Sequence, residues 1–323
     1  MDNFTHLHLH TQYSLLDGVV LIPALVEQLK EYKMTACAIT DHGWMAGVID
    51  FYKALKKVGI KPLIGVEAYI TYDQDDLENS QKQRDNMHMI LIAKDNTGYS
   101  RLLELVSQAA MHNFYYKPRI CIEHLKYLGG HVVATSACLA GVTSKSLAWN
   151  KSEYNVAISV EDKYGLAHAN IERFRQIFGE DFLLELQVWD DGNHHQQVYN
   201  EWLLDYGREH GIPFILTSDA HYLKLEDHKL HELLMAMQLK LTLEEYRQLP
   251  EMQYGPYFYL ADQAEMWKRA ESVNCLEAYN NTNLIAERCN VEIQLGKYQV
   301  PVYKIEEAED YREFLEWEKK QNG

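Results

Sequence analysis

The sequence has few of the features that mark an exported or membrane-bound protein. Its cysteines are odd in number and show no paired spacing: Cys37, Cys121, Cys138, Cys275 and Cys289. This pattern argues against a disulfide framework and indicates a reducing compartment, so we expect a cytoplasmic protein. No apolar run approaches the roughly 18 residues that a membrane span needs. The first residues show neither the basic nor the apolar region of a signal peptide, so we expect no association with a membrane.

Basic charge is also scarce. The 323 residues include 31 Lys and Arg against 47 Asp and Glu, which gives a formal net charge of -16. A domain that grips nucleic acid through a charged surface is normally basic, so this balance argues against that class. An acidic chain can instead hold divalent cations in a carboxylate-lined pocket, where the ions restore positive charge locally. Ordinary solubility would account for the acidity equally well.

The chain shows no internal repeat and no low-complexity tract, and strand-like and helix-like segments alternate along it. Apolar runs typical of strands occupy residues 5–9, 36–40, 62–66, 88–93, 131–135, 182–188 and 213–217. Amphipathic segments typical of helices lie between them at residues 23–32, 46–58, 98–112, 170–178 and 195–209. Alternation of this kind indicates parallel strands joined by helical crossovers, and seven such units favour a closed barrel over an open sheet.

The pattern becomes mainly helical after about residue 224. Residues 228–241, 265–272 and 276–290 have helical patterns around an aromatic segment at 254–259, and the charged residues 303–323 suggest a solvated helix. We therefore expect an α/β barrel with a small helical C-terminal extension over residues 1–290, the extension starting at about residue 225. Residues 291–323 are expected to be a linker or tail.

Histidine alternates with leucine near the start of the chain. In an extended strand His6, His8 and His10 would share one face, because successive side chains point to opposite sides. A turn carrying Asp17 follows. Imidazole nitrogens combined with a carboxylate are typical metal ligands, so this stretch predicts a metal site. The alternative is a polar edge strand with solvated histidines.

Polar residues also follow or flank the other predicted strands. Residues 41–43 (Asp-His-Gly), Glu67, Cys138 and residues 219–221 (Asp-Ala-His) come at or shortly after strand ends, whereas His88 opens its strand. The carboxyl ends of parallel barrel strands meet at one mouth, where functional groups gather. Each signal is weak alone: the first could be a turn, His88 a hydrogen-bonded histidine and Cys138 a small buried apolar residue. Their convergence on one end of the barrel predicts a functional site.

These motifs, taken in order, resemble the PHP (polymerase and histidinol phosphatase) family. The resemblance rests on residues 6–18, 39–43, 65–67, 88–93, 136–141 and 217–222. Residues 113–120, 178–182 and 281–290 resemble one branch in particular, the N-terminal domains of C-family replicative polymerases, which are the alpha subunits of bacterial DNA polymerase III. The likeness extends from about residue 4 to residue 303.

The resemblance implies a distorted (β/α)7 barrel that holds three divalent metal ions, usually zinc, manganese or iron. It carries nine ligand positions onto this chain, all of which hold coordinating residue types: His8, His10, Asp17, His42, Glu67, His88, Cys138, Asp219 and His221. His10, Glu67 and Asp219 are the implied catalytic residues. The family pattern does not make His6 a ligand, and Glu185, inside a predicted strand, is a further candidate for the pocket. Some polymerase members have lost these ligands, and this chain has kept them.

The implied chemistry is phosphodiester hydrolysis, in which clustered cations activate a water and offset the charge that develops on the phosphate. The leading hypothesis is a 3′–5′ exonuclease that acts in proofreading on a single-stranded DNA end during replication, with the rest of the alpha subunit and other replisome subunits as partners. One alternative is a phosphatase for a small phosphoester such as histidinol phosphate. Another is a metal-stabilised scaffold of the polymerase without catalysis.

Two further expectations come from the same resemblance. Tyr116, Lys117 and Arg119 could orient a DNA phosphate or stack on a base, or they could simply form a surface loop. The family polymerases continue for hundreds of residues beyond this barrel into palm, thumb and fingers. Because the sequence ends at Gly323, we expect it to lack the polymerase palm and not to polymerise nucleotides by itself.

Overall fold

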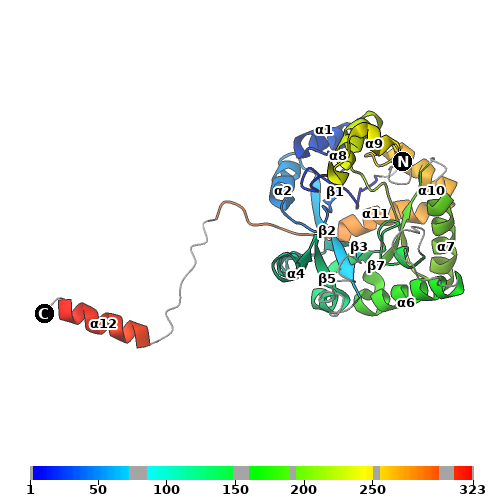
Figure 1. Cartoon of the computed structure of the whole chain (residues 1–323). Coiled ribbons are helices and arrows are strands. Elements are labelled where there is room, and N and C mark those ends of the chain that lie inside the picture. The colour runs from blue at the N-terminus through cyan, green and yellow to red at the C-terminus, as the bar shows by residue number, and fades with distance from the viewer. Residues whose placement is uncertain are drawn as a thin grey trace. The chain divides into compact units, whose positions relative to one another are not determined.

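The computed structural model describes residues 3–72, 86–147, 160–189, 194–249, 255–297 and 309–321. The chain divides into two compact units, Met1–Glu292 and Ile293–Gly323. In the second unit, part of the charged segment predicted to be helical forms α12 (Glu309–Gln321). The first unit contains every described strand, and helices surround its curved sheet (Figure 1).

The sheet has eight strands, six of which correspond to predicted ones. These six are β1 (Ala36–Ile39), β2 (Lys61–Thr71), β3 (Met87–Ala93), β6 (Val132–Thr135), β7 (Phe182–Gln187) and β8 (Phe214–Thr217). They pair in the order β1, β2, β3, β6, β7, β8, and a short hairpin of β4 (Phe114–Tyr115) and β5 (Lys117–Cys121) pairs with the far end of β2. The sequence predicts no strand at β4 or β5, and it predicts a shorter β2.

The N-terminal segment closes the sheet into a distorted barrel, as expected. It runs between β1 and β8, bridging His6 to Cys37 on one side and Leu9 to Ala220 on the other. The Ala38 amide donates to the His6 carbonyl at 2.8 Å, and the His10 amide donates to the Ala220 carbonyl at 2.8 Å. Residues 5–9, predicted as a strand, therefore fill the seventh position of the barrel through isolated bridges.

One strand departs from the predicted parallel arrangement. β3 is antiparallel to both of its neighbours, β2 and β6, whereas the pairings β1–β2, β6–β7 and β7–β8 are parallel. The expectation of seven parallel units is therefore wrong at β3. The reversal brings the first residues of β3 to the end of the barrel where the parallel strands finish, and His88 pairs there with Tyr69 near the end of β2.

The outer helices match the amphipathic segments within a few residues, except α6, which begins earlier than predicted. They are α1 (Ile22–Glu31), α2 (Val48–Lys57), α4 (Asn96–His112), α6 (Val160–Phe178) and α7 (His194–His210). In α4, Leu102, Leu105 and Val106 are buried against the sheet, and the Asp95 side chain caps the helix by accepting from the Gly98 amide at 2.8 Å. No described helix is both long and apolar enough to cross a bilayer.

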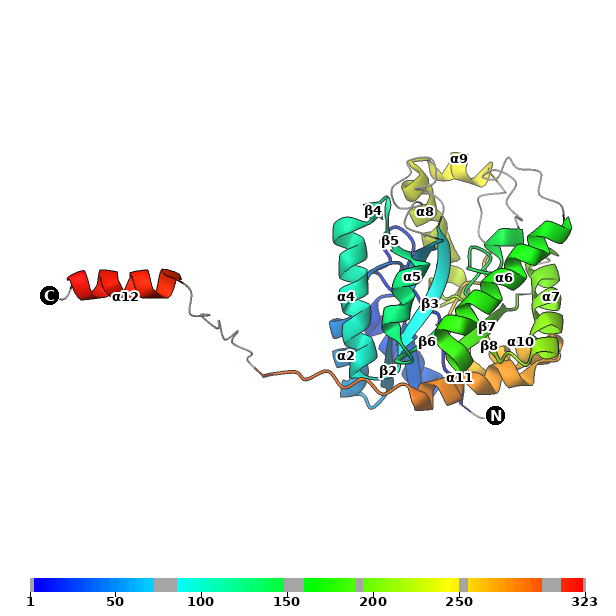
Figure 2. The same cartoon turned by 90° about the horizontal axis from the view of Figure 1, so that it is seen from below.

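The two ends of the barrel differ in character (Figure 2). At one end α11 (Leu276–Arg288) contributes Ile285 to an apolar cluster with Leu7, Ile90, Val133 and Ile215 from the barrel interior. α10 (Gln263–Ser272) packs beside α11. At the other end lie α8 (His228–Leu239) and α9 (Leu243–Arg247), next to the carboxyl ends of the parallel strands. Apolar side chains therefore fill the interior at the α11 end of the barrel, and the polar residues of the interior lie at the end covered by α8 and α9.

Candidate metal centre

The structure brings the side chains of all nine predicted ligands into one cluster at the mouth of the barrel. They come from the N-terminal segment, the loop after it, the interior of β2, the start of β3 and the loops after β1, β6 and β8. Five are buried: His8, His10, Glu67, Asp219 and His221. The other four, Asp17, His42, His88 and Cys138, are only partly buried and form the side of the cluster that faces solvent.

Glu67 lies at the centre of the inner part of this cluster. Its Oε2 is 2.6 Å from His42 Nδ1 and 3.2 Å from His10 Nε2. Its Oε1 is 2.8 Å from His88 Nδ1, which in turn lies 3.6 Å from the Cys138 sulfur. The two oxygens of one carboxylate thus face different imidazoles, which is the position that a bridging ligand between two ions needs.

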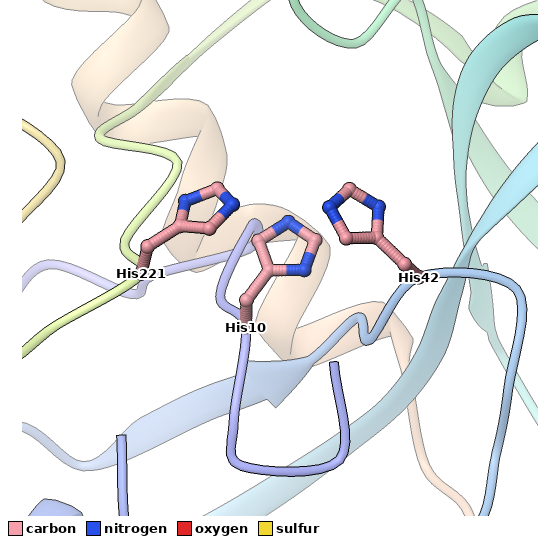
Figure 3. Close-up of side chains that lie close together, drawn as sticks. All are labelled: His10, His42 and His221. Atoms are coloured by element: carbon pink, nitrogen blue, oxygen red, sulfur yellow. The ribbon is translucent and has the colours of Figure 1, made fainter. Parts of the chain in front are cut away.

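Asp17 and Asp219 each lie between two histidines of the cluster. Asp17 Oδ2 is 2.9 Å from His42 Nε2, and its Oδ1 is 3.5 Å from His221 Nε2. Asp219 Oδ1 is 3.1 Å from His8 Nε2 and 3.5 Å from His221 Nδ1. Figure 3 shows the ring of His10 between those of His42 and His221, and its centroid is 4.1 and 4.2 Å from theirs.

Several of these atoms are buried without a hydrogen bond. Among the described residues they include His42 Nδ1, both carboxylate oxygens of Glu67 and Oδ1 of Asp219. A buried polar atom left in this state costs on the order of 1–3 kcal/mol. Atoms of four ligand groups also lie within 4.8 Å of one another: His10–His42–His221, His8–His10–Asp219, His42–Glu67–His88 and Asp17–His221–His231. Nitrogen and oxygen donors at these spacings, with a thiol beside them, fit divalent metal ions.

Three of the histidines have their Nδ1 atoms hydrogen-bonded to groups that are not among the predicted ligand atoms. His8 donates from Nδ1 to Glu185 at 2.7 Å, and His221 donates to the carbonyl of Asp219 at 2.8 Å. His10 Nδ1 lies 3.0 Å from the Ser14 hydroxyl, which donates to Asp41 at 2.8 Å and therefore accepts from the imidazole. Each partner leaves the Nε2 lone pair directed into the cluster, which is how outer-shell groups orient histidine ligands.

The pKa shifts follow from the crowding of carboxylates and imidazoles. Burial opposes charge on His8, but the Asp219, Glu185 and Glu67 carboxylates outweigh it and raise its pKa well above the usual range. Burial also opposes charge on His42, yet Glu67 and Asp17 raise its pKa to about 10. The Glu67 and Asp17 carboxyls, despite burial, have pKa values held well below their usual range by the surrounding imidazoles. Without metal, protons on the imidazoles thus balance the carboxylates. Metal ions would take over this role by displacing the protons.

Strained backbone occurs beside three of the ligands. Positive φ angles occur at Leu16 (63°), directly before Asp17, at Ala137 (56°), directly before Cys138, and at Asp219 itself (51°). A left-handed conformation costs a non-glycine residue of order 1–3 kcal/mol, and such residues concentrate at functional sites. At Gly18, after Asp17, a Cβ atom would lie 2.2 Å from the Thr11 carbonyl oxygen, so the turn requires glycine.

Residues outside the predicted ligand set also have defined places. His6 lies apart from the cluster: its Nε2 is 2.9 Å from the carbonyl of Ala261, and burial lowers its pKa to about 4, so it is a neutral structural histidine. Glu185, a candidate for the pocket, contacts the cluster through His8. The strand-end pattern missed His231 of α8, whose Nε2 is 3.1 Å from Asp17 Oδ1. The sequence offers one signal for His231: it lies three residues after His228, so the two histidines share one face of a helix.

The three predicted substrate-binding residues lie on the β4–β5 hairpin and differ in accessibility. Tyr116 is 67% exposed. Lys117 Nζ is 3.1 Å from the hydroxyl of Tyr69, whose ring lies 5.9 Å from that of His42, so Lys117 reaches the edge of the cluster. Arg119 is buried, and its Nε donates to the Asn113 carbonyl at 3.2 Å. The structure thus gives Arg119 a contact within the hairpin in place of an exposed position.

Comparison with known proteins decides the family. The model of the PHP domain matches residues 6–188. The chain belongs to the PHP domain family. This PHP domain is 36% identical to the DNA polymerase III subunit alpha of Aquifex aeolicus over 97% of this chain and 27% of that protein. It is 38% identical to the Helicobacter pylori protein of the same name over 90% of this chain and 23% of that protein. The chain thus spans about a quarter of the length of these relatives.

A solved structure with a distant likeness is a Bifidobacterium adolescentis protein whose name places it among the metal-dependent phosphoesterases. It is 18% identical, with a TM-score of 0.41 over 68% of this chain and 88% of that chain. An amidohydrolase from Chromobacterium violaceum is similar at 16% identity and a TM-score of 0.36, over 67% of this chain and 87% of that chain. These likenesses are too distant to inform the chemistry of the present site.

Proposed function

We propose that this PHP domain hydrolyses phosphodiesters with divalent metal ions and acts as a 3′–5′ exonuclease on single-stranded DNA. The observation that carries the proposal is the pair of Glu67 oxygens, which are buried, lack hydrogen bonds and lie between His10, His42 and His88. A purely structural carboxylate at this depth would accept hydrogen bonds, whereas both Glu67 oxygens face imidazoles that are themselves potential metal ligands. A carboxylate that bridges metal ions needs both oxygens available.

Three ions would be held by overlapping ligand sets. His8, His10 and Asp219 form one set, to which Glu67 adds a carboxylate oxygen. A second set comprises His42, Glu67 and His88, with the Cys138 sulfur beside His88. Asp17 and His221 form the core of the third set. Imidazole and carboxylate ligands suit zinc, manganese and iron, and the thiol favours a borderline-soft ion such as zinc.

When bound, such ions supply an activated water and offset the charge that develops on a phosphate. The chain's own residues position the substrate around them. The partly buried side of the cluster, with Asp17, His42 and His88, is the side that a phosphate can approach. Lys117, at the edge of this opening, would pair with a backbone phosphate, and the exposed ring of Tyr116 would stack on an unpaired base. Arg119 would stabilise this hairpin through its hydrogen bond to the Asn113 carbonyl.

The relatives give the proposal its biological setting. Because they are DNA polymerase III alpha subunits, we place this PHP domain within such a subunit, where it would serve DNA replication and proofreading in the cytoplasm beside other replisome subunits. In this arrangement residues 1–290 form the metal-dependent barrel, and residues 291–323 lead toward the polymerase palm. The partners are then a single-stranded 3′ end of DNA and the remainder of the alpha subunit.

Two other functions remain to be separated from this one. A phosphatase for a small phosphoester such as histidinol phosphate would use the same ions. A scaffold without catalysis is favoured by a different observation: the cluster joins the N-terminal segment to β2 and β8, so ions bound there would fasten the closure of the barrel.

The test compares substrates on the purified chain after loading with manganese or zinc. We expect 5′-labelled single-stranded DNA to be shortened stepwise from its 3′ end and histidinol phosphate to remain intact. Glu67→Gln should abolish the activity, whereas Glu123→Gln, a change at an exposed carboxylate on α5 (Ile122–Leu125), should leave it unchanged. Hydrolysis of histidinol phosphate alone would establish the phosphatase. A metal-loaded chain that hydrolyses neither substrate would establish the scaffold.

A further inference from the structure

α8 contributes one side chain to the metal centre. His231 is almost fully buried, although α8 is a surface helix. Its Nε2 is 3.1 Å from Asp17 Oδ1, and the same oxygen lies 3.5 Å from His221 Nε2. The ring centroids of His221 and His231 are 5.4 Å apart. One carboxylate oxygen therefore faces two imidazole nitrogens that come from different segments.

The spacing of these atoms is that of ligands around a common ion. A tetrahedral ion with its ligands at about 2.1 Å separates those ligands from one another by about 3.4 Å. The two separations in the structure, 3.1 and 3.5 Å, lie on either side of this value. Without metal, a hydrogen bond from His231 and an ion pair with His221 satisfy this oxygen, and a bound ion would take the place of both.

Few contacts attach α8 to the barrel among the residues that the structure describes. The buried residues of this helix are His231, Met235 and Ala236, and the last two pack in a small cluster with Tyr246 of α9. In the part of the chain that the structure describes, the main packing partners of α8 are α9 and the adjoining turn η4 (Leu225–Asp227). Its apolar residues Leu230, Leu233 and Met237 are 55%, 46% and 55% exposed. The helix thus reaches the centre of the barrel mouth mainly through His231.

We propose that His231 is a tenth metal ligand, which completes the site of Asp17 and His221, and that the ion held there fastens α8 to the barrel mouth. The inference rests on the metal centre of the proposed function but not on the reaction. With the ion bound, α8 is held over the cluster. Without it, the contacts of α8 with the barrel among the described residues include the hydrogen bond from His231 to Asp17, the ring of Tyr222 with its centroid 5.5 Å from that of His231, and a weak contact between His228 and Tyr222 at 3.4 Å.

The test uses His231→Ala together with His228→Ala, which removes a histidine one turn earlier on the same helix without touching the cluster. Bound zinc per chain is counted by mass spectrometry after equilibration at buffered free zinc. We expect His231→Ala to bind one of the ions at least about tenfold more weakly, while His228→Ala binds like the wild type. His231→Cys, which retains a zinc ligand, should restore most of the lost affinity. Circular dichroism checks that each variant is folded.

Hydrogen exchange supplies the second measurement. In the wild type we expect α8 amides to be protected with zinc and to exchange at least about tenfold faster after chelation, whereas in His231→Ala they should exchange rapidly in both states. Unchanged zinc affinity in folded His231→Ala, or α8 exchange that ignores zinc in the wild type, would overturn this inference alone. A wild type that binds no metal would overturn the proposed function as well. If zinc binding behaves as expected but no phosphoester is hydrolysed, the His231 assignment stands and the nuclease proposal fails.

Discussion

The substitution Glu185→Gln tests whether the Glu185 carboxylate orients the proposed metal ligand His8, since Glu185 is not itself among the proposed ligands. Glu185 is fully buried on β7. It accepts from His8 Nδ1 at 2.7 Å, from the Thr135 hydroxyl at 2.5 Å and from the Thr217 hydroxyl at 2.6 Å. Glutamine has the same shape, and the threonine hydroxyls can rotate to accept from its amide. We therefore expect Glu185→Gln to fold normally.

The magnitude follows from the hydrogen bond to His8. A bond to a charged acceptor contributes roughly 1.5–3 kcal/mol, against roughly 0.5–1.5 kcal/mol for a neutral one, so the change removes about 1–1.5 kcal/mol. This corresponds to about a tenfold loss of affinity for the ion that His8 holds. If the amide NH₂ turns toward Nδ1, it favours the tautomer with a proton on Nε2, and the loss approaches about 100-fold, the upper end for outer-shell changes.

The assay is competition for zinc or manganese between the protein and a coloured chelator at constant pH. Glu123→Gln serves as the matched control because it makes the same chemical change at an exposed site. We expect the control to match the wild type and Glu185→Gln to bind at least one ion about 10–100-fold more weakly. Affinity within twofold of the wild type in a folded Glu185→Gln would refute the idea that this carboxylate orients His8.

Further predictions concern the ions, the pH and the substrate. His10→Ala and Asp219→Ala should stay folded by circular dichroism and reduce hydrolysis of single-stranded DNA at least about 100-fold, and wild-type rates would place the activity elsewhere. Chelation should lower the melting temperature, because Asp17, Glu67 and Asp219 lose the cations between them, and identical melts would contradict this. The folded pKa of His42, about 10 against an unfolded 6.5, contributes stability to the metal-free protein below pH 6.5 that is lost as the pH rises toward 10. Melts from pH 6.5 to 9 should therefore show a falling melting temperature without metal and no such fall with metal, and the opposite trend would sink the argument. Lys117→Ala should raise KM for DNA several-fold with little change in kcat, which steady-state kinetics would measure.

The sequence predicted the strands, the helices and the clustering of ligands because these depend on local patterns. Apolar runs followed by Asp, His or Cys mark the ends of β1, β6 and β8, although β2 continues beyond Glu67 to Thr71. A barrel brings the ends of its parallel strands together at one mouth. The direction of β3 was not predictable in this way, since an apolar run looks the same in either direction. His88 gave the only hint, because it stood at the start of its strand while the other ligands stood at the ends.

What the sequence missed depends on how distant segments dock. His231 lies on a helix of the C-terminal extension, and only the packing of α8 over the barrel mouth brings it to Asp17. Arg119 looked available for DNA because it stands near Tyr116 and Lys117, but the pairing of β5 with β2 turns it into the protein. The burial of Arg119 and the packing of α8 depend on residues far away in the sequence, so neither shows as a periodic pattern in the chain.

The N-terminal segment links the stability of the barrel to its candidate metal centre. The backbone of residues 6–10 bonds to β1 on one side and to Ala220 on the other, so this short segment closes the barrel. The side chains of His8 and His10 on the same segment face Glu67 and Asp219. Any ion that joins these residues therefore also joins the closing segment to β2 and to the end of β8. It follows that the free energy of metal binding would add to the stability of barrel closure, and that removing the ions would weaken the barrel at this segment.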